Sequence, residues 1–259
     1  MALPVTLGQQ ERQALDDLAE EIRARRPVVA FTGAGISTES GIPDFRGPSG
    51  LWKRAKPTKY RDFLAQPDLR LSYWERRRTR YPVLAGAEPN AGHVALARLQ
   101  ANGYLCDIIT QNIDGLHQKA GSPPGTVIEL HGSAHHIRCV TCRQIFAANE
   151  FPLPADGLEP SCPACGGIVK EATISFGESL DVDDLRRSLE IARGADLMLV
   201  VGSSLQVNPA ARIPQVARQS GAALAIVNNE PTPLDDRADL VVRGPAGAAL
   251  TYLAELLVG

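Results

Sequence analysis

Two short stretches of the chain carry side chains that could move a proton or orient a ligand. TQNIDGLHQKAG places Gln111, Asn112 and Asp114 directly after an apolar run, and VIELHGS places His131 after the next run. A lone histidine is often structural, but one at the carboxyl edge of a parallel sheet is well placed to act as a base. With an unperturbed pKa of about 6.5, it can take a proton from a sugar hydroxyl at physiological pH. These residues predict general-base chemistry with His131 as the base.

A glycine-rich turn follows the first apolar run. In FTGAGISTESGIPDFRG, after PVVAF, Gly33 and Gly35 form Gly-x-Gly without the third glycine of the dinucleotide fingerprint. Taken alone, this pattern also fits a tight packing turn. The continuation favours a ligand, because it adds an acceptor, a flat apolar wall and a guanidinium that suits phosphate. These groups belong to Asp44, Phe45 and Arg46. We predict that phosphate approaches the backbone here, where the glycines leave room.

Two further strand ends carry small polar residues. VVGSSLQVNPA ends an apolar run in Gly202, Ser203 and Ser204, whose hydroxyls suit a phosphate or a ribose. IVNNE ends the next run in Asn228 and Asn229, which suit a ribose or adenine contact. Because parallel sheets bind ligands outside their carboxyl edge, three such ends predict one extended dinucleotide.

Four of the five cysteines form two CxxC pairs. Cys139, Cys142, Cys162 and Cys165 stand as CVTC, nineteen intervening residues and CPAC. This spacing is typical of a four-cysteine zinc site, and a closed tetrathiolate has no open position, so we predict one structural zinc per chain. Two redox pairs are the disfavoured alternative, since neither pair opens a helix after a strand. Cys106, in LCDIIT, is predicted to be a buried core thiol.

Apolar runs that alternate with amphipathic stretches predict the elements that position these residues. Buried strands are expected at 27–32, 105–110, 126–130, 196–202, 223–228 and 239–243, and helices at 9–26, 92–101, 182–193, 210–220 and 246–257. This alternation predicts an α/β fold with a doubly wound parallel sheet. The two intervals that interrupt it, after the first and the third strand, are expected to form a smaller lobe.

Composition narrows the class of protein. The chain has 259 residues, 44% hydrophobic and 22% charged, with a formal net charge of -2, so no strong field gathers nucleic acid or an anionic membrane. No apolar run approaches the roughly 20 residues needed to span a bilayer. The start, MALPVTLGQQERQALDDLAEE, lacks the regions of a signal peptide, so a cytoplasmic location is expected. In that reducing compartment the cysteines favour metal binding over disulfides.

Seven motifs, taken in chain order, resemble those of one known family. GAGISTESGIPDFRG, GLW, TQNIDGLHQKAG, ELHGS, the paired CxxC, FGE and GSSLQVNPA resemble the sirtuins, NAD-dependent protein-lysine deacylases. The resemblance extends from about residue 27 to the C-terminus. It implies a Rossmann-like NAD-binding large domain and a small lobe. The implied ranges are 1–43, 87–133 and 172–259 for the large domain, 44–86 for a helical cofactor-loop insertion, and 134–171 for a zinc-binding module.

The resemblance also implies a role for each matching position. The implied NAD-binding residues are Ala34, Gly35, Ile42, Asp44, Phe45, Arg46, Gln111, Asn112, Asp114, Ser203, Ser204 and Asn228. Gly33, Gly202, Asn229 and Ala246 complete the candidate set for the cofactor. His131 is the implied catalytic base, with Asn112 and Asp114 beside it. Ile174, Phe176, Gly177 and Glu178 are implied to grip the acyl-lysine peptide by β-augmentation.

The reaction implied by the resemblance consumes NAD. The acyl oxygen attacks the anomeric carbon of the nicotinamide ribose and nicotinamide leaves. His131 then deprotonates a ribose hydroxyl, so that the acyl group migrates to the sugar and lysine and O-acyl-ADP-ribose are released. The expected partners are acylated lysine side chains of proteins, and the chain is expected to be a monomer that binds neither membrane nor nucleic acid.

Three other functions are alternatives. A protein mono-ADP-ribosyltransferase or NAD glycohydrolase would use the same pocket but would need neither His131 nor the FGE strand. A non-catalytic zinc and nucleotide-binding module would tolerate loss of Asn112, Asp114 or His131, and none is lost. A hydride-transfer dehydrogenase is disfavoured by the missing GxGxxG.

Two departures from the family pattern bear on the substrate peptide and the adenine. KEATISFGE has Glu171 where many members have proline, and RGPAG (243–247) lacks the acidic residue common after that glycine. Neither departure is expected to touch the catalytic core, so both leave the reaction type intact and affect the expected peptide preference.

A basic segment bears on the acyl group. Tyr73 and Arg76 have the spacing that binds acidic acyl groups in the desuccinylating branch. However, the thirteen-residue step from Arg76 to Pro89 is longer than in that branch, and the segment is more similar to the mitochondrial class II branch and its bacterial relatives. At least two of the four arginines are expected to lie on a solvated helix face: Arg76, Arg77, Arg78 and Arg80.

Overall fold

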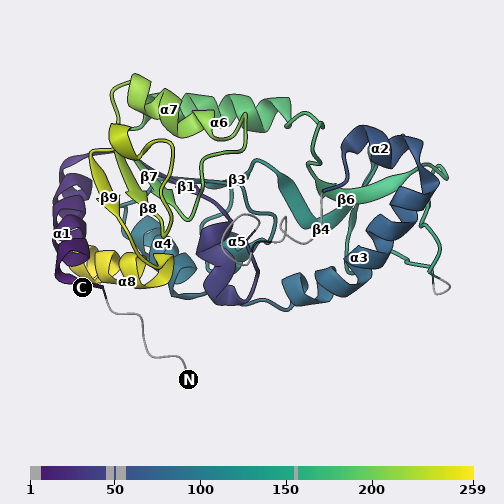
Figure 1. Ribbon diagram of the computed structural model, residues 1–259, viewed down its shortest axis with the longest axis horizontal. Helices are drawn as coiled ribbons and strands as arrows, with labels where there is room; N and C mark the ends of the chain where they lie inside the picture. Colours follow the sequence, from purple (N-terminus) through teal and green to yellow (C-terminus); the bar gives the residue numbers. More distant parts are fainter. Residues whose placement is uncertain (1–6, 45–49, 51–56, 155–156) are drawn as a thin grey trace.

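A parallel six-stranded sheet, in the order β3-β2-β1-β7-β8-β9, forms the centre of the larger lobe (Figure 1). The computed structural model describes residues 7–44, 50, 57–154 and 157–259. The strands are β1 (Val28–Thr32), β2 (Asp107–Thr110), β3 (Val127–Glu129), β7 (Leu197–Val201), β8 (Ala223–Val227) and β9 (Leu240–Val242). β1, β7 and β8 are buried along their whole length, as expected of apolar runs covered on both faces.

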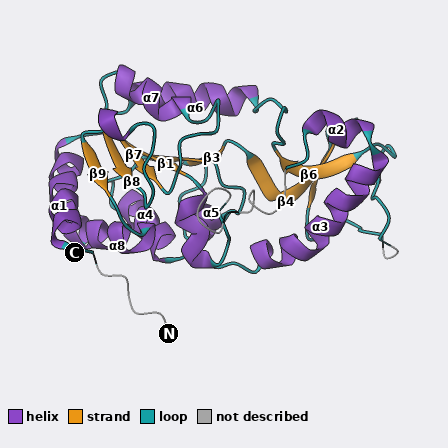
Figure 2. Cartoon of the chain, in the orientation of Figure 1, coloured by secondary structure: helices purple, strands orange, loops and turns teal. Residues whose placement is uncertain are grey.

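Helices cover both faces of this sheet (Figure 2). One face is covered by α1 (Gln9–Ala24), α4 (Ala91–Ala101) and α8 (Ala246–Val258), and the other by α6 (Val182–Gly194) and α7 (Arg212–Gln219). Successive residues of β1 therefore enter different cores, with Ala30 packed in the first and Phe31 in the second. The predicted doubly wound α/β fold is confirmed.

The smaller lobe combines a three-stranded antiparallel sheet with two helices. The sheet has the order β5-β4-β6 and contains β4 (Gly132–Cys139), β5 (Ile145–Ala147) and β6 (Val169–Thr173). The helices are α2 (Tyr60–Ala65) and α3 (Pro67–Ala85), at the right of Figure 1. Trp74 of α3 packs with Ile137, Phe151 and Val169, so the two interrupting intervals share one core. The domain boundaries given above stay a prediction.

The order of the strands creates a switch point in the sheet. From β1 the chain continues to β2 and β3 on one side, and later to β7, β8 and β9 on the other. The loops that follow β1 and β7 therefore leave adjacent strands in opposite directions, which opens a crevice for ligands. Short helices occupy the remaining connections: η1 (Ala34–Ser40), α5 (Leu116–Lys119) and η3 (Asp235–Arg237).

The arginines of α3 lie in different environments. Arg76 and Arg80 are exposed, as predicted for at least two of the four. Arg77 is buried, with 2% of its side chain exposed. Arg78 donates to the carbonyl oxygens of Pro154, Gly157 and Leu158. The prediction of at least two solvated arginines is therefore confirmed, while Arg77 and Arg78 have partners inside the lobe.

One cysteine differs from its prediction. Cys106 is exposed rather than buried, because it precedes β2 at the amino edge of the sheet, ahead of the residues that the helices cover. Over the described ranges, no helix is long and apolar enough to cross a membrane.

Candidate active site

Five strands of the large sheet end at one edge, and predicted site residues follow each of them. β1 is followed by the turn from Gly33, β2 by Gln111, β3 by His131, β7 by Gly202 and β8 by Asn228. Since these strands are all parallel, their carboxyl ends meet at the same edge. The structure thus brings together residues that lie up to two hundred positions apart in the chain.

The glycines of the first turn pack against the loop after β7. A Cβ added to Gly35 would lie 2.8 Å from the Cα of Gly202, and one added to Gly33 would lie 2.8 Å from the Gly202 oxygen. The N–H of Gly35 donates to that same oxygen at 2.8 Å. The close approach of the two loops is therefore a further reason for these glycines, and the approach of a phosphate to their backbone stays a prediction.

The turn continues into the predicted nicotinamide side of the site. η1 is followed by Gly41, whose φ of 80° is left-handed. The N–H of Ile42 then donates to the backbone oxygen of Ser37 at 3.3 Å. Ala34, Ile42 and Asp44 are all half-buried. Phe45 and Arg46 lie outside the described residues.

His131 is oriented by a backbone carbonyl. Its Nδ1 lies 2.9 Å from the oxygen of Gln111. Because a carbonyl oxygen only accepts, Nδ1 carries the proton and Nε2 of the neutral ring keeps a free lone pair. Burial lowers the pKa of His131 below 6.5, and the bond to Gln111 opposes this only in part. The imidazole is therefore neutral at physiological pH, with Nε2 available as a base.

Asn112 and Asp114 are held by a serine that the sequence analysis did not select. Ser37 donates to Oδ2 of Asp114 at 2.7 Å and accepts from Nδ2 of Asn112 at 3.0 Å. Asn112 also donates to the oxygen of Gly33, and Oδ1 of Asp114 accepts from the N–H of Leu116. Both side chains are nearly buried, so η1 fixes the polar groups after β2 in one arrangement.

Two buried histidines lie behind this cluster. Nε2 of His93 lies 3.4 Å from the Ser37 hydroxyl, and Nε2 of His117 lies 2.9 Å from that of Thr32. Burial lowers the pKa of His93 to about 4 and that of His117 to about 3, so both rings are neutral. The sequence analysis did not select His93, because no motif considered there includes it.

The end of β7 joins this network, and the end of the neighbouring strand β8 carries its own polar residues. Gln111 donates from Nε2 to the hydroxyl of Ser203 at 2.8 Å, which joins the loops after β2 and β7. Ser204 is half-buried beside it. Asn228 donates to the oxygen of Glu230 at 2.6 Å, while Asn229 is exposed.

The amino end of α8 completes this side of the site. Ala246 begins the helix and is buried. The N–H of Gly247 donates to a carboxylate oxygen of Glu39 at 2.9 Å. Glu39, from η1, thus places an acidic group at this helix end, where RGPAG itself has none.

The predicted peptide-binding residues form a half-exposed segment, 174–178, which we call the peptide segment. It continues β6, and the N–H of Ile174 donates to the oxygen of His131 at 2.8 Å. Phe176 is 39% exposed, and its oxygen accepts from the N–H of Tyr60 at 2.9 Å. Gly177 has a left-handed φ of 81°, and Glu178 forms ion pairs with side chains of β4 and β6. The candidate base and the peptide segment are therefore joined directly.

The four predicted zinc ligands lie together in the smaller lobe. Their Sγ atoms are all within 4.8 Å of one another, with 3.6 Å between Cys139 and Cys165 and 3.7 Å between Cys142 and Cys162. A tetrahedral zinc with bonds of about 2.3 Å separates its sulfurs by about 3.8 Å. The geometry thus fits a four-coordinate structural zinc. Cys139 and Cys162 also pack in the core of this lobe.

A pocket of about 280 Å³ lies behind Asp114, between α5 and β4. Its lining includes Leu84, Leu116, Glu129 and His135. Burial, and next the charge of Asp114, raise the pKa of Glu129 to about 7.

The raised pKa of Glu129 predicts a pH-dependent stability. The folded chain holds a proton here between pH 4.5 and about 7 that the unfolded chain has lost, so the free energy of unfolding falls as the pH rises through this window. In Glu129→Gln this decrease in the free energy of unfolding is absent, because glutamine does not titrate. We expect the variant to match the wild type at pH 4 and to exceed it by about 3 kcal/mol at pH 8 in urea unfolding. Glu75→Gln, at an exposed position, is the control, and a pH-independent gain would contradict the assignment.

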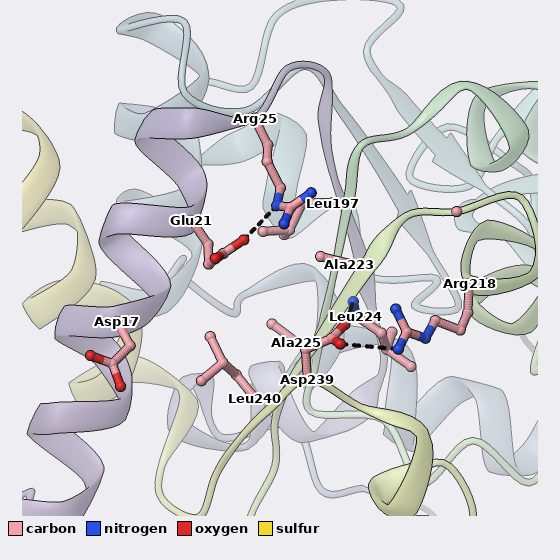
Figure 3. Close-up of a pocket in the computed structure, with 11 residues that line it drawn as sticks. Asp17, Glu21, Arg25, Leu197, Arg218, Ala223, Leu224, Ala225, Asp239 and Leu240 are labelled. Atoms are coloured by element: carbon pink, nitrogen blue, oxygen red, sulfur yellow. Dashed lines mark hydrogen bonds and ion pairs between the residues drawn. The ribbon is translucent and has the colours of Figure 1, made fainter.

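A second pocket, of about 290 Å³, lies at the opposite edge of the sheet (Figure 3). It is bounded by α1 and the amino ends of β7, β8 and β9. Four of its charged residues form two ion pairs, Arg25 with Glu21 and Arg218 with Asp239. None of the predicted site residues that the structure describes lines this pocket.

Comparison with known proteins points to one family. The Sir2 family matches residues 33–209 of the chain. An NAD-dependent protein deacetylase of Rhodopseudomonas palustris is 45% identical over 239 residues, which cover 91% of this chain and 94% of that protein.

Solved structures agree with this match. A Sir2 structure with a deacetylated p53 peptide and 3'-O-acetyl ADP ribose has a TM-score of 0.86 at 36% identity, covering 93% of this chain and 97% of that one. A Sir2 complex with a p53 peptide and NAD+ has a TM-score of 0.84 at 36% identity, with the same coverage of 93% and 97%.

Proposed function

The chain belongs to the Sir2 family, and from this we infer that it is an NAD-dependent protein-lysine deacetylase in which His131 is the general base. One observation carries the assignment of the base. Nδ1 of His131 donates to the backbone oxygen of Gln111, and the backbone oxygen of His131 accepts from the N–H of Ile174, the first residue of the peptide segment. The free Nε2 thus belongs to a ring that is fixed relative to both the cofactor loops and the substrate strand.

The groups around His131 support a separate role for each in binding or proton transfer. Bound NAD supplies an electrophilic ribose carbon and nicotinamide as the leaving group. The loops after β1 and β7 would hold the diphosphate, and Asn112 and Asp114 would orient the nicotinamide ribose. Nε2 of His131 would take the proton of a ribose hydroxyl. The Gln111 oxygen, which accepts from Nδ1, then stabilises the imidazolium.

The peptide segment would add a strand of substrate to its own edge. Such β-augmentation uses main-chain groups, which explains how one site can accept many protein sequences. Zinc, held by the four cysteines, would stabilise the fold of the smaller lobe, which carries the peptide segment. It takes no part in the chemistry, because four thiolates leave no open position.

We propose acetyl-lysine, with some tolerance for longer acyl chains, as the substrate rather than acidic acyl-lysine. Tyr73 donates its hydroxyl to Glu171 at 2.9 Å, and Arg76 donates to the hydroxyl of Thr58 at 3.1 Å. Both members of the Tyr-x-x-Arg pair therefore have partners within the smaller lobe. This supports placing the chain with the bacterial relatives of the class II branch.

Mass spectrometry of the products tests the function. The protein is incubated with NAD and a panel of acetyl-, longer acyl- and succinyl-lysine peptides. We expect free lysine peptide, nicotinamide and O-acetyl-ADP-ribose, with little turnover of the succinyl peptide. Nicotinamide release without deacylation, or ADP-ribose attached to protein, would instead indicate a glycohydrolase or a transferase.

A monomeric state and a cytoplasmic location are part of the same proposal. The cytoplasm is supported by the tetrathiolate site, which needs reduced cysteines. Light scattering should give the mass of one chain, and cell fractionation should recover the protein with the cytosol. A stable dimer, or recovery elsewhere, would overturn the corresponding part.

A further inference from the structure

Glu171 is a buried carboxylate on β6, at the position where many sirtuins have proline. Only 1% of its side chain is exposed. It accepts from the hydroxyl of Tyr73 at 2.9 Å and from Arg80, and lies 3.3 Å from Nε of Arg77. All three partners belong to α3. Burial, and then the charge of Glu171, raise the pKa of Tyr73 well above 10, so its hydroxyl stays a donor.

This charge cluster is not arranged for stability alone. The guanidinium of Arg77 lies over two aromatic rings, 5.5 Å from the centre of Trp74 and 4.2 Å from that of Tyr81. Within the described residues, Nε and Nη2 of Arg77 and Oε1 of Glu171 have no hydrogen-bond partner. A buried ion pair with incomplete hydrogen bonding contributes little net stability, although loss of one member is costly. Net stability alone therefore does not explain why this cluster is present, which points to a functional role.

The contacts of Glu171 complete a continuous set of connections from β6 through the peptide segment, α2 and α3 back to β6. β6 leads directly into this segment, and the Phe176 oxygen accepts from the N–H of Tyr60 at the start of α2. Lys59 and Phe176 also form a parallel bridge. α2 is followed at once by α3, which returns to β6 through Glu171. The peptide segment is therefore connected to α2 through Phe176, and β6, from which it continues, is connected to α3 through Glu171.

The opposite face of β6 holds the segment in a second way. Lys170 is fully buried, and its Nζ lies 3.0 Å from Oε2 of Glu178. The same carboxylate pairs with Arg138 of β4 and accepts from the N–H of Ser175 at 2.9 Å. Since neighbouring side chains of a strand point to opposite faces, Lys170 and Glu171 anchor β6 from both sides.

We propose that Glu171 is a positioning residue for substrate peptide binding, acting through α3 and α2 on the edge of the peptide segment. It contacts no reacting atom, and this role rests on the proposed deacetylase function. The carboxylate sets how far α2 stands from β6, and hence the geometry of the main-chain groups around Phe176. The backbone N–H of Glu171, which proline would lack, reinforces this by donating to the Tyr73 hydroxyl at 3.2 Å.

Steady-state kinetics of Glu171→Gln with an acetyl-lysine peptide test the proposal. We expect the KM for the peptide to rise about tenfold, because a displaced strand edge aligns poorly with the substrate, while kcat and the KM for NAD change less than about twofold. A purely structural role would reduce the amount of folded enzyme, which lowers the apparent kcat and leaves the peptide KM unchanged. Glu171→Asp, which keeps the charge, should restore part of the affinity.

Two other variants keep the test decisive. Tyr73→Phe removes one hydroxyl and keeps the ring that packs on Phe63, so it should fold even if Glu171→Gln does not, and should raise the peptide KM by a smaller factor. Glu159→Gln is the matched control, because it also removes an ion pair between α3, at Arg70, and the zinc-bearing segment, but away from β6. Its peptide KM should equal that of the wild type.

The outcomes separate this inference from the function on which it rests. A wild-type protein that fails to deacetylate any peptide would refute the proposed function. An active wild type, with an unchanged peptide KM in both folded Glu171→Gln and Tyr73→Phe, would refute the role of Glu171 and leave the function intact. An equal rise in Glu159→Gln would also refute it, since any loosening of the lobe would then suffice.

Discussion

Replacing His131 by Ala is expected to lower deacetylation by about 10² to 10⁴-fold, the usual contribution of a positioned general base. The variant loses Nε2, the atom that would take the ribose proton, and keeps the loops after β1 and β7 that would bind NAD. O-acetyl-ADP-ribose formation, followed by mass spectrometry, measures the loss. Calorimetric titration should show NAD affinity within about threefold of the wild type.

His136→Ala is the matched control for this variant. His136 lies exposed on β4, five residues further along the chain, and should not alter turnover. Retained deacetylation in His131→Ala would refute the base assignment, whereas loss of NAD binding would show that the ring supports the pocket instead.

The lowered pKa of His131 sets the pH dependence expected of the wild type. The base acts in its neutral form, and burial moves its pKa below 6.5. The value of kcat/KM should therefore fall to half of its plateau only at a pH below 6.5. A half-maximal value above pH 6.5 would contradict this environment for the ring.

Cys139→Ser is expected to unfold the smaller lobe rather than to alter the chemistry. Structural zinc contributes on the order of 10 kcal/mol in small zinc modules, about as much as the whole stability of a typical domain. Cys139 is buried among Trp74, Ile137 and Val169, so loss of the metal also loosens this core. We expect the variant to contain less than one zinc per chain, to lose its cooperative thermal transition and to be recovered mostly as insoluble protein.

The chain offers its own control for the zinc site. Cys106 is exposed and lies outside the cluster, so Cys106→Ser should keep one zinc, its melting temperature and its activity. A chelator added to the wild type should reproduce the effect of Cys139→Ser. A soluble, zinc-free and fully active Cys139→Ser protein would refute the structural role of the metal.

The regular elements could be predicted closely from the sequence. The run expected as a strand at 27–32 is Val28–Thr32, that at 196–202 is Leu197–Val201, and the helix expected at 182–193 is Val182–Gly194. These elements are buried or amphipathic along their whole length, so their periodicity is written into neighbouring residues. The error at Cys106 arose at the end of such a run, where burial depends on what covers the edge.

The polar contacts of the candidate site could not be predicted in the same way. Ser37 holds both Asn112 and Asp114 across more than seventy residues, and His93 lies behind it. A serine or a histidine has no periodic signature, and its partners depend on which loops the sheet brings together. The packing of Gly35 against Gly202 is a contact of this kind as well.

The parallel sheet, the four-cysteine site and the candidate base could each be predicted from the sequence, because each depends on local burial, short spacing or a motif at a strand end. The contacts that hold these parts in place could be found only in the folded chain. The tertiary structure placed Nδ1 of His131 on Gln111, which leaves Nε2 as the nitrogen that can accept a proton. It also turned Glu171, expected only to modify peptide preference, into a buried link between α3 and β6. Such contacts join residues far apart in the chain, and their energies depend on burial and distance, which exist only once the chain has folded.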